Sequence, residues 1–171
     1  FIVGDAINQL QDAKITTDTS VNPRIHQTRN GFSWLVNGTP YYIRGVAYNP
    51  GHDWRDGHSV LSREQLEKDF KAISAMGANT IRRYGPGFGD RNILNVANDC
   101  KLKVLYGFNF DPQTDYLSDS LQLLIYHDQV IANVLRYRDH PAVLAWVLGN
   151  ETWGLLKQHY KQPYLTAVRR R

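Results

Sequence analysis

The stretch Ala142-Val143-Leu144-Ala145-Trp146-Val147-Leu148-Gly149-Asn150-Glu151 is a short apolar run that ends in a glycine, an amide and a carboxylic acid. The run is rich in β-branched and aromatic residues, which is typical of a strand buried in a parallel sheet. In a barrel of alternating strands and helices, a Glu at the carboxyl end of a strand lies on the face that carries active sites. The stretch therefore predicts that Glu151 can protonate a leaving oxygen and that the Asn150 amide can hold a ligand hydroxyl.

Three further strand-like segments precede this one, and helix-like segments separate them. The strands are expected at residues 41–48, 78–84 and 102–108, before the one at 142–148. Ser62-Arg63-Glu64-Gln65 is a capping box that opens the first helix, and Gly77 ends that helix.

The later helices also have marked ends. Asp90 is expected to cap the second helix, and Ser118 or Ser120 opens a long third helix. A last helix begins near Trp153, with an expected break near Pro163.

Apolar residues at helical spacing predict which face of each of the first three helices packs on the sheet. The expected stripes are Leu66, Phe70, Ile73 and Met76, then Ile93, Leu94, Ala97 and Cys100, then Leu121, Leu124, Ile131, Val134 and Leu135. Cys100 is the only cysteine, so no internal disulfide can form, and its place in a stripe favours a small core residue over a nucleophile.

The repeated alternation of strand and helix predicts an α/β protein with a parallel sheet. A barrel and an open doubly wound sheet both fit this alternation. No G-x-G-x-x-G opens the first helix, and the Gly-rich segment 85–89 lacks the Lys-Ser/Thr of a phosphate loop. We interpret that segment as a strand-to-helix turn.

The N-terminal part of the chain has a different character. Asn30-Gly31 and Asn37-Gly38 are turn signals on both sides of an apolar run at 32–36, which predicts a small hairpin that caps the base of the domain. Residues 1–30 are expected to be a peripheral extension, with a short strand at 24–27, and residues 31–171 to form the domain.

Composition narrows the function classes. The chain has 171 residues, of which 42% are hydrophobic and 21% charged, and this fits one globular domain and argues against disorder. The net charge of +4 is mild, and the basic tail Arg169-Arg170-Arg171 is interpreted as a solvated helix end, so no nucleic-acid partner is expected. No apolar run approaches the roughly 18 residues of a membrane span. The sequence leaves the compartment open, an extracellular or periplasmic location included.

The ends of the four expected strands carry the polar and aromatic residues of a binding wall. These ends are Tyr48-Asn49, Arg82-Arg83-Tyr84, Phe108-Asn109 and Asn150-Glu151. Amides and a guanidinium can bond hydroxyls, and aromatic rings can stack on C–H faces. Together they predict a neutral polyhydroxylated ligand.

Two residues at these strand ends, Glu151 and Arg82, have a purely structural interpretation as well as a functional one. Glu151 could simply be a first-turn acid favoured by the dipole of the next helix, whereas a general acid needs a raised pKa from an apolar wall or a second carboxylate. The preceding Gly149-Asn150 and the following Trp153 make catalysis our preferred interpretation. Arg82 could be a surface ion-pair partner, or it could hold a carboxylate ionised in a barrel mouth.

No metal or cofactor is expected. His52, Asp53, Asp56 and His58 are close in sequence, but their spacing matches no standard metal motif.

The motifs, taken together, resemble a known family. Residues 140–151 closely resemble the fourth-strand signature of family 2 glycoside hydrolases, which belong to the (β/α)8 retaining glycosidases of clan A. Residues 32–40 and 43–46 look like the start of the same barrel. Residues 42–48 and 79–82 are also similar to fungal β-1,3-glucanosyltransferases of that clan.

The resemblance covers about residues 24–154 and implies a partial (β/α)8 TIM barrel of about four βα units after a short hairpin. It implies that Glu151 is the acid/base, that Asn150 contacts the sugar 2-hydroxyl and that Arg82 is the partner of the nucleophile. By looser analogy, it assigns the sugar subsite to Tyr48, Tyr84, Asn109 and Trp153.

The resemblance also implies that this chain holds one half of such a barrel. Complete barrels have eight strands, and the clan's nucleophile is a Glu after the seventh strand, whereas about four strand-helix units are visible here. The expected function is a retaining glycoside hydrolase or its acid/base-bearing half, acting on O-glycosidic bonds of an oligo- or polysaccharide. The alternatives are a β-glucan transglycosylase and a non-catalytic carbohydrate-binding or half-barrel assembly module. Open sheet edges predict self-association or pairing with the missing half.

Overall fold

The computed structural model describes residues 23–28, 31–48 and 62–168. Several sequence predictions fall on residues outside these ranges and stay predictions. They concern the extension before residue 23, the turn residue Asn30, the strand-end residue Asn49, the four residues His52, Asp53, Asp56 and His58, and the tail Arg169-Arg170-Arg171.

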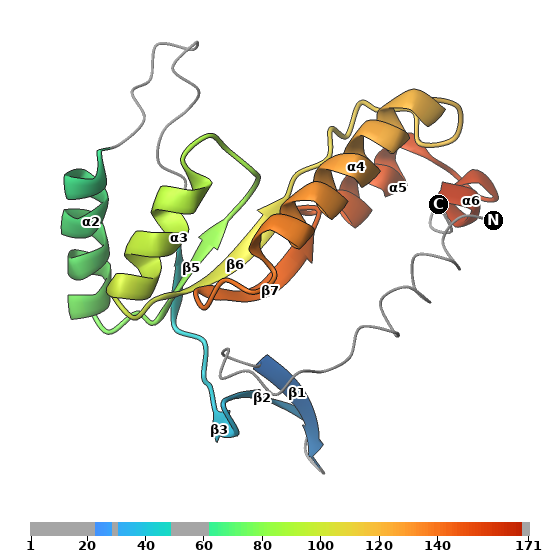
Figure 1. Cartoon of the computed structure of the whole chain (residues 1–171). Coiled ribbons are helices and arrows are strands. Elements are labelled where there is room, and N and C mark those ends of the chain that lie inside the picture. The colour runs from blue at the N-terminus through green and yellow to red at the C-terminus, as the bar shows by residue number, and fades with distance from the viewer. Residues whose placement is uncertain (1–22, 29–30, 49–61, 169–171) are drawn as a thin grey trace.

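A four-stranded parallel sheet carries the fold. Its strands lie in the order β4 (Gly45–Ala47), β5 (Thr80–Arg83), β6 (Lys103–Phe108) and β7 (Val143–Leu148). The helices between them, α2 (Arg63–Ala75), α3 (Asp90–Asp99) and α4 (Ser120–Tyr137), cover one face of this sheet (Figure 1). A doubly wound sheet would have helices on both faces. The one-sided arrangement is that of part of a (β/α)8 barrel, as expected.

The core lies between the sheet and these helices. Alternate strand residues point toward the helices, and Ile81, Val104 and Tyr106 among them are fully buried. Leu66 and Phe70 of α2 and the apolar residues of α3 fill the other side. Cys100 packs against this cluster, as its stripe predicts.

Two of the predicted stripe assignments are wrong. Met76 is 72% exposed, because it is the C-cap of α2 and lies beyond the last helical turn. In α4, Leu121, Leu124, Ile131 and Leu135 are exposed, and the residues that pack on the core are Val130, Val134 and Tyr137. Helix α4 has apolar residues on two faces. Most residues of the predicted stripe lie on the face that points away from the sheet.

Helix α4 begins at Ser120, one of the two residues expected to open it, whereas the predicted cap of α3 needs correction. Asp119 is the N-cap of α4, and its carboxylate accepts a hydrogen bond from the Gln122 backbone N–H at 2.9 Å. Asp90 is the first residue of α3 and Gly89 is the N-cap. The Asp90 carboxylate is engaged in the buried contacts described below. By contrast, Ser62 caps α2 as predicted, since its hydroxyl accepts from the Gln65 N–H at 3.1 Å.

The first barrel strand is shorter than the expected 41–48. Only Gly45–Ala47 pairs with β5, because the preceding backbone is held by Asn79, whose side-chain oxygen accepts from the Arg44 N–H at 2.9 Å.

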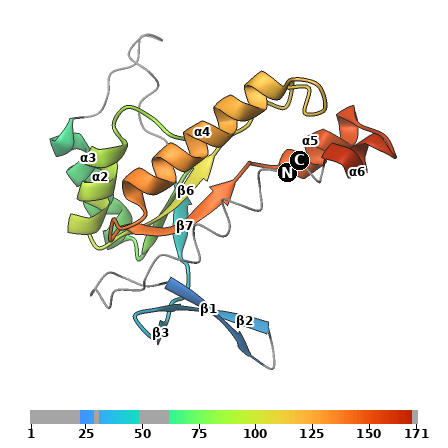
Figure 2. The ribbon, with the colours of Figure 1, turned by 45° about the vertical axis from the view of Figure 1, so that its right-hand side comes forward.

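The predicted hairpin is present as a small antiparallel sheet of β1 (Pro23–Thr28), β2 (Gly31–Val36) and β3 (Thr39–Pro40). Asn37 and Gly38 turn the chain with positive φ values of 52° and 76°. The Tyr41 hydroxyl donates to the Asn79 carbonyl at 2.8 Å, which ties this sheet to the residue that precedes β5. The hairpin therefore lies at the base of the parallel sheet (Figures 1 and 2). The expected domain boundary at residue 30 stays a prediction.

The chain after β7 forms two short helices, α5 (Thr152–His159) and α6 (Tyr164–Val168). The break between them includes Pro163, as predicted. Both helices extend past the carboxyl end of β7 (Figure 2).

Candidate active site

The carboxyl ends of β5, β6 and β7 meet at one edge of the sheet. The Gly149 N–H donates to the Phe108 carbonyl at 2.8 Å, which continues the β6–β7 ladder one step beyond β7. This bond places Asn150 and Glu151 directly above the end of β6. The polar residues that follow the strands therefore gather on one side, as a parallel sheet requires.

Strand alternation sends the two adjacent arginines of β5 to opposite faces. Arg82 is in register with Ala47, Leu105 and Ala145, the row that faces away from the helices. Arg83 is in register with Tyr106, which lies in the helix-facing core. Only Arg82 therefore lies on the face that becomes the interior of a closed barrel.

Arg82 links the ends of β5 and β7. Its Nη2 donates to the Asn150 side-chain oxygen at 3.0 Å, and its guanidinium carbon lies 4.8 Å from the centre of the Tyr84 ring. The Arg82 Nε is buried and has no hydrogen-bond partner among the described residues. The structure thus brings together three of the predicted site residues, Arg82, Asn150 and Tyr84. The Nε donor of Arg82 remains unpaired among the described residues.

Arg83 has a structural role that the sequence did not reveal. Its Nη2 lies 2.7 Å from the Asp90 carboxylate, and both side chains are almost fully buried. Asp90 also accepts hydrogen bonds from the Tyr106 hydroxyl and from the Gly87 N–H. Burial, together with the bond to Asp90, raises the pKa of Tyr106 well above its usual range. This network fixes β5, α3 and β6 behind the candidate site.

The same network explains the Gly-rich segment 85–89. The Gly87 N–H donates to Asp90 at 2.7 Å, and a Cβ on Gly87 would lie 3.0 Å from Arg83 Nη2. The segment is therefore a strand-to-helix turn that serves the buried ion pair. Among the described residues, no cluster of His, Cys, Asp and Glu could hold a metal ion.

Glu151 lies in a tight turn with unusual backbone geometry. It adopts the left-handed conformation, with φ 53° and ψ 17°, which costs a non-glycine residue on the order of 1–3 kcal/mol. Gly149 has φ 78°, and a Cβ there would lie 2.1 Å from the Thr152 hydroxyl oxygen. Glu151 is the N-cap of α5, yet its side chain makes no capping hydrogen bond. Helix capping therefore does not account for this exposed carboxylate.

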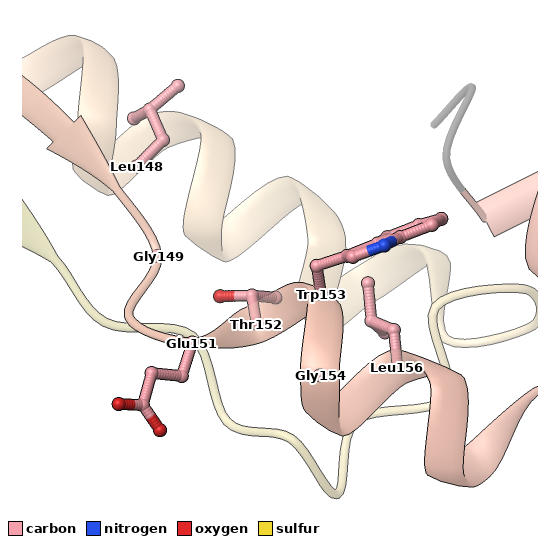
Figure 3. Close-up of a pocket in the computed structure, with 7 residues that line it drawn as sticks. All are labelled: Leu148, Gly149, Glu151, Thr152, Trp153, Gly154 and Leu156. Carbon is pink, nitrogen blue, oxygen red and sulfur yellow. The ribbon is translucent and has the colours of Figure 1, made fainter.

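An open depression of about 700 Å³ lies beside this turn (Figure 3). Its lining includes Leu148, Trp153 and Leu156, and Trp153 is 43% exposed. The Lys157 ammonium lies 5.3 Å from the centre of the Trp153 ring. Figure 3 shows the Glu151 carboxylate pointing away from the Trp153 ring. Trp153 therefore offers an apolar surface near the acid, on another side of the turn.

Two aromatic residues near the site lie on the helix-facing side. The Tyr48 hydroxyl donates to Asp69 of α2 at 2.6 Å, and its ring packs edge-on against Phe70. Burial, and then the bond to Asp69, raises the pKa of Tyr48 well above its usual range. Trp146 stacks on Phe108 and packs against the helix-facing core.

Asn109 and Tyr84 remain on the candidate face. Asn109 follows β6, is exposed and lies next to Gly85 in the turn after β5. Tyr84 is also exposed and lies under the Arg82 guanidinium.

A carboxylic acid at the carboxyl end of a barrel strand lies on the face that carries active sites in this fold. The model of the family "Glycosyl hydrolases family 2, TIM barrel domain" matches residues 28–170. The chain belongs to this family, and it carries a part of the family's barrel domain.

The similar curated proteins include a glucanosyltransferase and two glycosidases. The chain is 24% identical to 1,3-beta-glucanosyltransferase GAS5 of Saccharomyces cerevisiae, over 90% of this chain and 32% of that protein. It is 27% identical to the beta-galactosidase of Pectobacterium atrosepticum, over 69% of this chain and 12% of that protein. It is also 27% identical to the beta-glucuronidase of Paenibacillus borealis, over 71% of this chain and 22% of that protein. The chain thus spans a third or less of each of these relatives.

Solved structures show the same fold. The beta-glucuronidase of Parabacteroides merdae superimposes with a TM-score of 0.59 at 17% identity, covering 80% of this chain and 18% of that protein. At 17% identity, this structural similarity is evidence for a shared fold alone. In the part of the chain that the structure describes, no helix has the length and apolar character needed to cross a membrane.

Proposed function

We propose that Glu151 is the general acid/base of a retaining glycoside hydrolase reaction. The observation that carries the proposal is its strained, exposed position at the carboxyl end of β7, next to the Arg82–Asn150 pair. Non-glycine residues in the left-handed conformation cluster at functional sites, where the surrounding structure holds them against their local preference.

In the proposed reaction, Glu151 gives its proton to the glycosidic oxygen while a second carboxylate attacks the anomeric carbon. The C–O bond to the leaving sugar breaks, and a glycosyl-enzyme ester forms. The Glu151 carboxylate then takes a proton from water, and this water oxygen attacks the anomeric carbon and releases the enzyme carboxylate. Hydrolysis becomes transglycosylation when an acceptor sugar hydroxyl replaces the water.

Arg82 and Asn150 support the two carboxylates in this proposal. Asn150, oriented by its bond from Arg82, is placed to contact the sugar 2-hydroxyl. The remaining Arg82 donors would hold the nucleophilic carboxylate ionised. Tyr84, Asn109 and Trp153 are the proposed sugar contacts. Tyr48 leaves this set, because its hydroxyl is bonded to Asp69 on the helix side.

The proposed reaction needs a second carboxylate about 5–5.5 Å from the first. Among the described residues, Arg82 has no carboxylate partner. We therefore propose that a complementary half-barrel supplies it, and that it joins along the open edges of β4 and β7.

The test compares the 171-residue chain with a hybrid barrel. In the hybrid, residues 28–170 replace the matching segment of the Paenibacillus borealis beta-glucuronidase. We expect the isolated chain to release no 4-nitrophenol from β-glucuronide, β-galactoside or β-glucoside substrates. We expect the hybrid to be active on at least one of them, and Glu151→Gln to lower its steady-state turnover, because the second step loses its general base.

Glu64→Gln is the matched control, because Glu64 is an exposed glutamate on the first turn of α2. Full activity in the Glu151→Gln hybrid would contradict the proposed role. Robust turnover by the isolated chain would contradict the need for a second half.

The self-association of two copies through their open edges is a second proposal, and the sheet order supports it. It predicts a dimeric mass in solution at micromolar concentration. A monomer that binds oligosaccharide without turnover would instead favour a carbohydrate-binding module.

A further inference from the structure

The helix that begins at Glu151 has little packing to hold it. None of the α5 residues is buried, and Gly154 in its first turn weakens the helix by about 1 kcal/mol relative to alanine. Isolated helices this short are marginal in water. The direction of α5 therefore depends strongly on the contacts at its two ends.

The near end of α5 is the joint formed by the tight turn at Gly149–Glu151. Gly149 and Glu151 both adopt positive φ values, and the Gly149 N–H is bonded to the Phe108 carbonyl. This bond fixes the start of the turn without setting the direction of the helix that leaves it.

The far end of α5 is tied to the loop after β6 by Tyr160. The Tyr160 hydroxyl accepts from the Tyr116 N–H at 2.9 Å and donates to the Asp115 carboxylate at 3.1 Å. The Tyr160 N–H in turn bonds the Leu156 carbonyl, so the residue belongs to the last turn of α5. The Tyr160 hydroxyl thus joins the end of α5 to a loop that is far away in the sequence.

The loop residues that bond Tyr160, Asp115 and Tyr116, make further contacts of their own. The side chain of Tyr116 is buried, and its hydroxyl donates to the Asp111 carbonyl at 2.8 Å. Hydrogen bonds from the Ser118 hydroxyl, the Leu117 N–H and the Tyr160 hydroxyl lower the pKa of Asp115. Asp115 therefore remains an ionised acceptor at neutral pH.

From these contacts we propose that Tyr160 is a positioning residue for Glu151. It locks the far end of α5 to the loop that begins at Asn109, so that α5 cannot swing about the Gly149–Glu151 joint. Because Glu151 is the N-cap of α5, such a swing would move its carboxylate relative to Asn150 and Asn109. A misplacement of about 1 Å at a reacting group can cost on the order of 100-fold in rate.

The first test measures the geometry and needs no substrate. In the 171-residue chain, Tyr160→Phe should raise amide hydrogen exchange across residues 149–159 at least about tenfold, which corresponds to 1.4 kcal/mol of lost protection. Exchange in β5 and β6 should stay unchanged. Tyr164→Phe is the control, because Tyr164 lies on α6 and is 60% exposed. Unchanged exchange across residues 149–159 in Tyr160→Phe would overturn the proposal.

The second test rests on the proposed function and uses the hybrid barrel. Tyr160→Phe should lower kcat/KM about tenfold when Glu151 is present and should have no further effect in the Glu151→Gln background. Equal losses in both backgrounds would show that Tyr160 acts on general stability, and this would overturn the positioning role. If Glu151→Gln itself has no effect, the proposed function fails, while the exchange experiment still decides whether Tyr160 holds α5.

Discussion

Gly149 carries the backbone conformation on which the candidate site depends. Its φ of 78° is in the region that favours glycine, and the Thr152 hydroxyl occupies the space a Cβ would need. Gly154, by contrast, has open space around its Cα and lies inside α5. The two glycines of this segment therefore differ sharply in their tolerance of a side chain.

Gly149→Ala should lower the free energy of unfolding by about 1–3 kcal/mol, through backbone strain and the clash with Thr152. Gly154→Ala should raise it by about 0.5–1 kcal/mol, since alanine favours the helix. Urea unfolding followed by circular dichroism measures both. Equal effects from the two substitutions would be inconsistent with the turn described.

His140 predicts a pH dependence of stability. Its Nδ1 accepts from the Ala142 N–H at 3.2 Å, and its Nε2 faces the Asn95 side-chain oxygen at 3.1 Å. Burial, and then the nearby Lys103, lowers the pKa of His140. The unfolded chain therefore binds more protons than the folded one just below the ordinary His pKa of about 6.5. Stability should be full above that pH and fall as the pH drops toward the folded pKa.

Unfolding measured between pH 7.5 and pH 5 checks this expectation. His140→Asn keeps an acceptor for the Ala142 N–H and removes the titration, so it should flatten the profile. His127→Asn is the control, because His127 is exposed on α4 and should leave the slope intact. A slope that survives in His140→Asn would show that another group is responsible.

At the level of single residues, the sequence predicts which residues form the candidate site better than it predicts which way their side chains point. Glu151, Asn150 and Arg82 could be chosen because they follow short apolar strands, and Arg82 and Asn150 do meet in the structure. The outward direction of Tyr48 depends on where β4 starts to pair, which the sequence does not mark. Tyr160 could not be found, because its partners lie in a loop far away in the sequence.

At the level of elements, the β5–α3–β6 unit is held by the buried Arg83–Asp90 pair. Asp90→Asn would leave the Arg83 guanidinium buried without a counter-charge, and we expect a loss of about 3–5 kcal/mol in unfolding free energy. Asp99→Asn is the control. Asp99 pairs with Arg63 on the surface, so the expected loss is much smaller than that of Asp90→Asn. Similar losses in chemical denaturation would argue against a buried network.

Helix α4 shows how an element can be predicted correctly and its face wrongly. Val134 packs on the core, whereas Leu135 is exposed. Val134→Ala should therefore lower the unfolding free energy by about 1 kcal/mol, and Leu135→Ala should change it by less than about 0.5 kcal/mol. Thermal unfolding of the two variants distinguishes the faces. The opposite order would restore the stripe that the sequence predicts.

The reason for this error is visible in the arrangement of the helices. Apolar periodicity identifies a helix and the faces it can bury, but α4 has apolar residues on two faces, and only one can contact this sheet. The presence of a parallel sheet, by contrast, follows from the alternation of periods and from short connections. The α/β class was therefore accessible from these patterns, and the sequential strand order from the family resemblance.

At the scale of the whole molecule, two features indicate the need for further structure. Among the residues that the structure describes, β4 and β7 have no further strand partner, and α4 exposes a row of apolar side chains. Membership of the family's barrel domain explains both, since a closed barrel covers its strand edges and surrounds each helix with neighbours. The catalytic proposal depends on the same completion, because it requires a second carboxylate.

The most direct test of the central claim is the leaving-group dependence of Glu151→Gln in the hybrid barrel. A general acid matters most when the leaving oxygen is basic. For an alkyl β-glycoside, kcat/KM should therefore fall by about 10²–10⁴-fold. For the 2,4-dinitrophenyl glycoside, whose leaving group needs no proton, the first step should be nearly unchanged. An equal loss for both substrates, or no loss for either, would contradict the assignment of Glu151 as the acid/base.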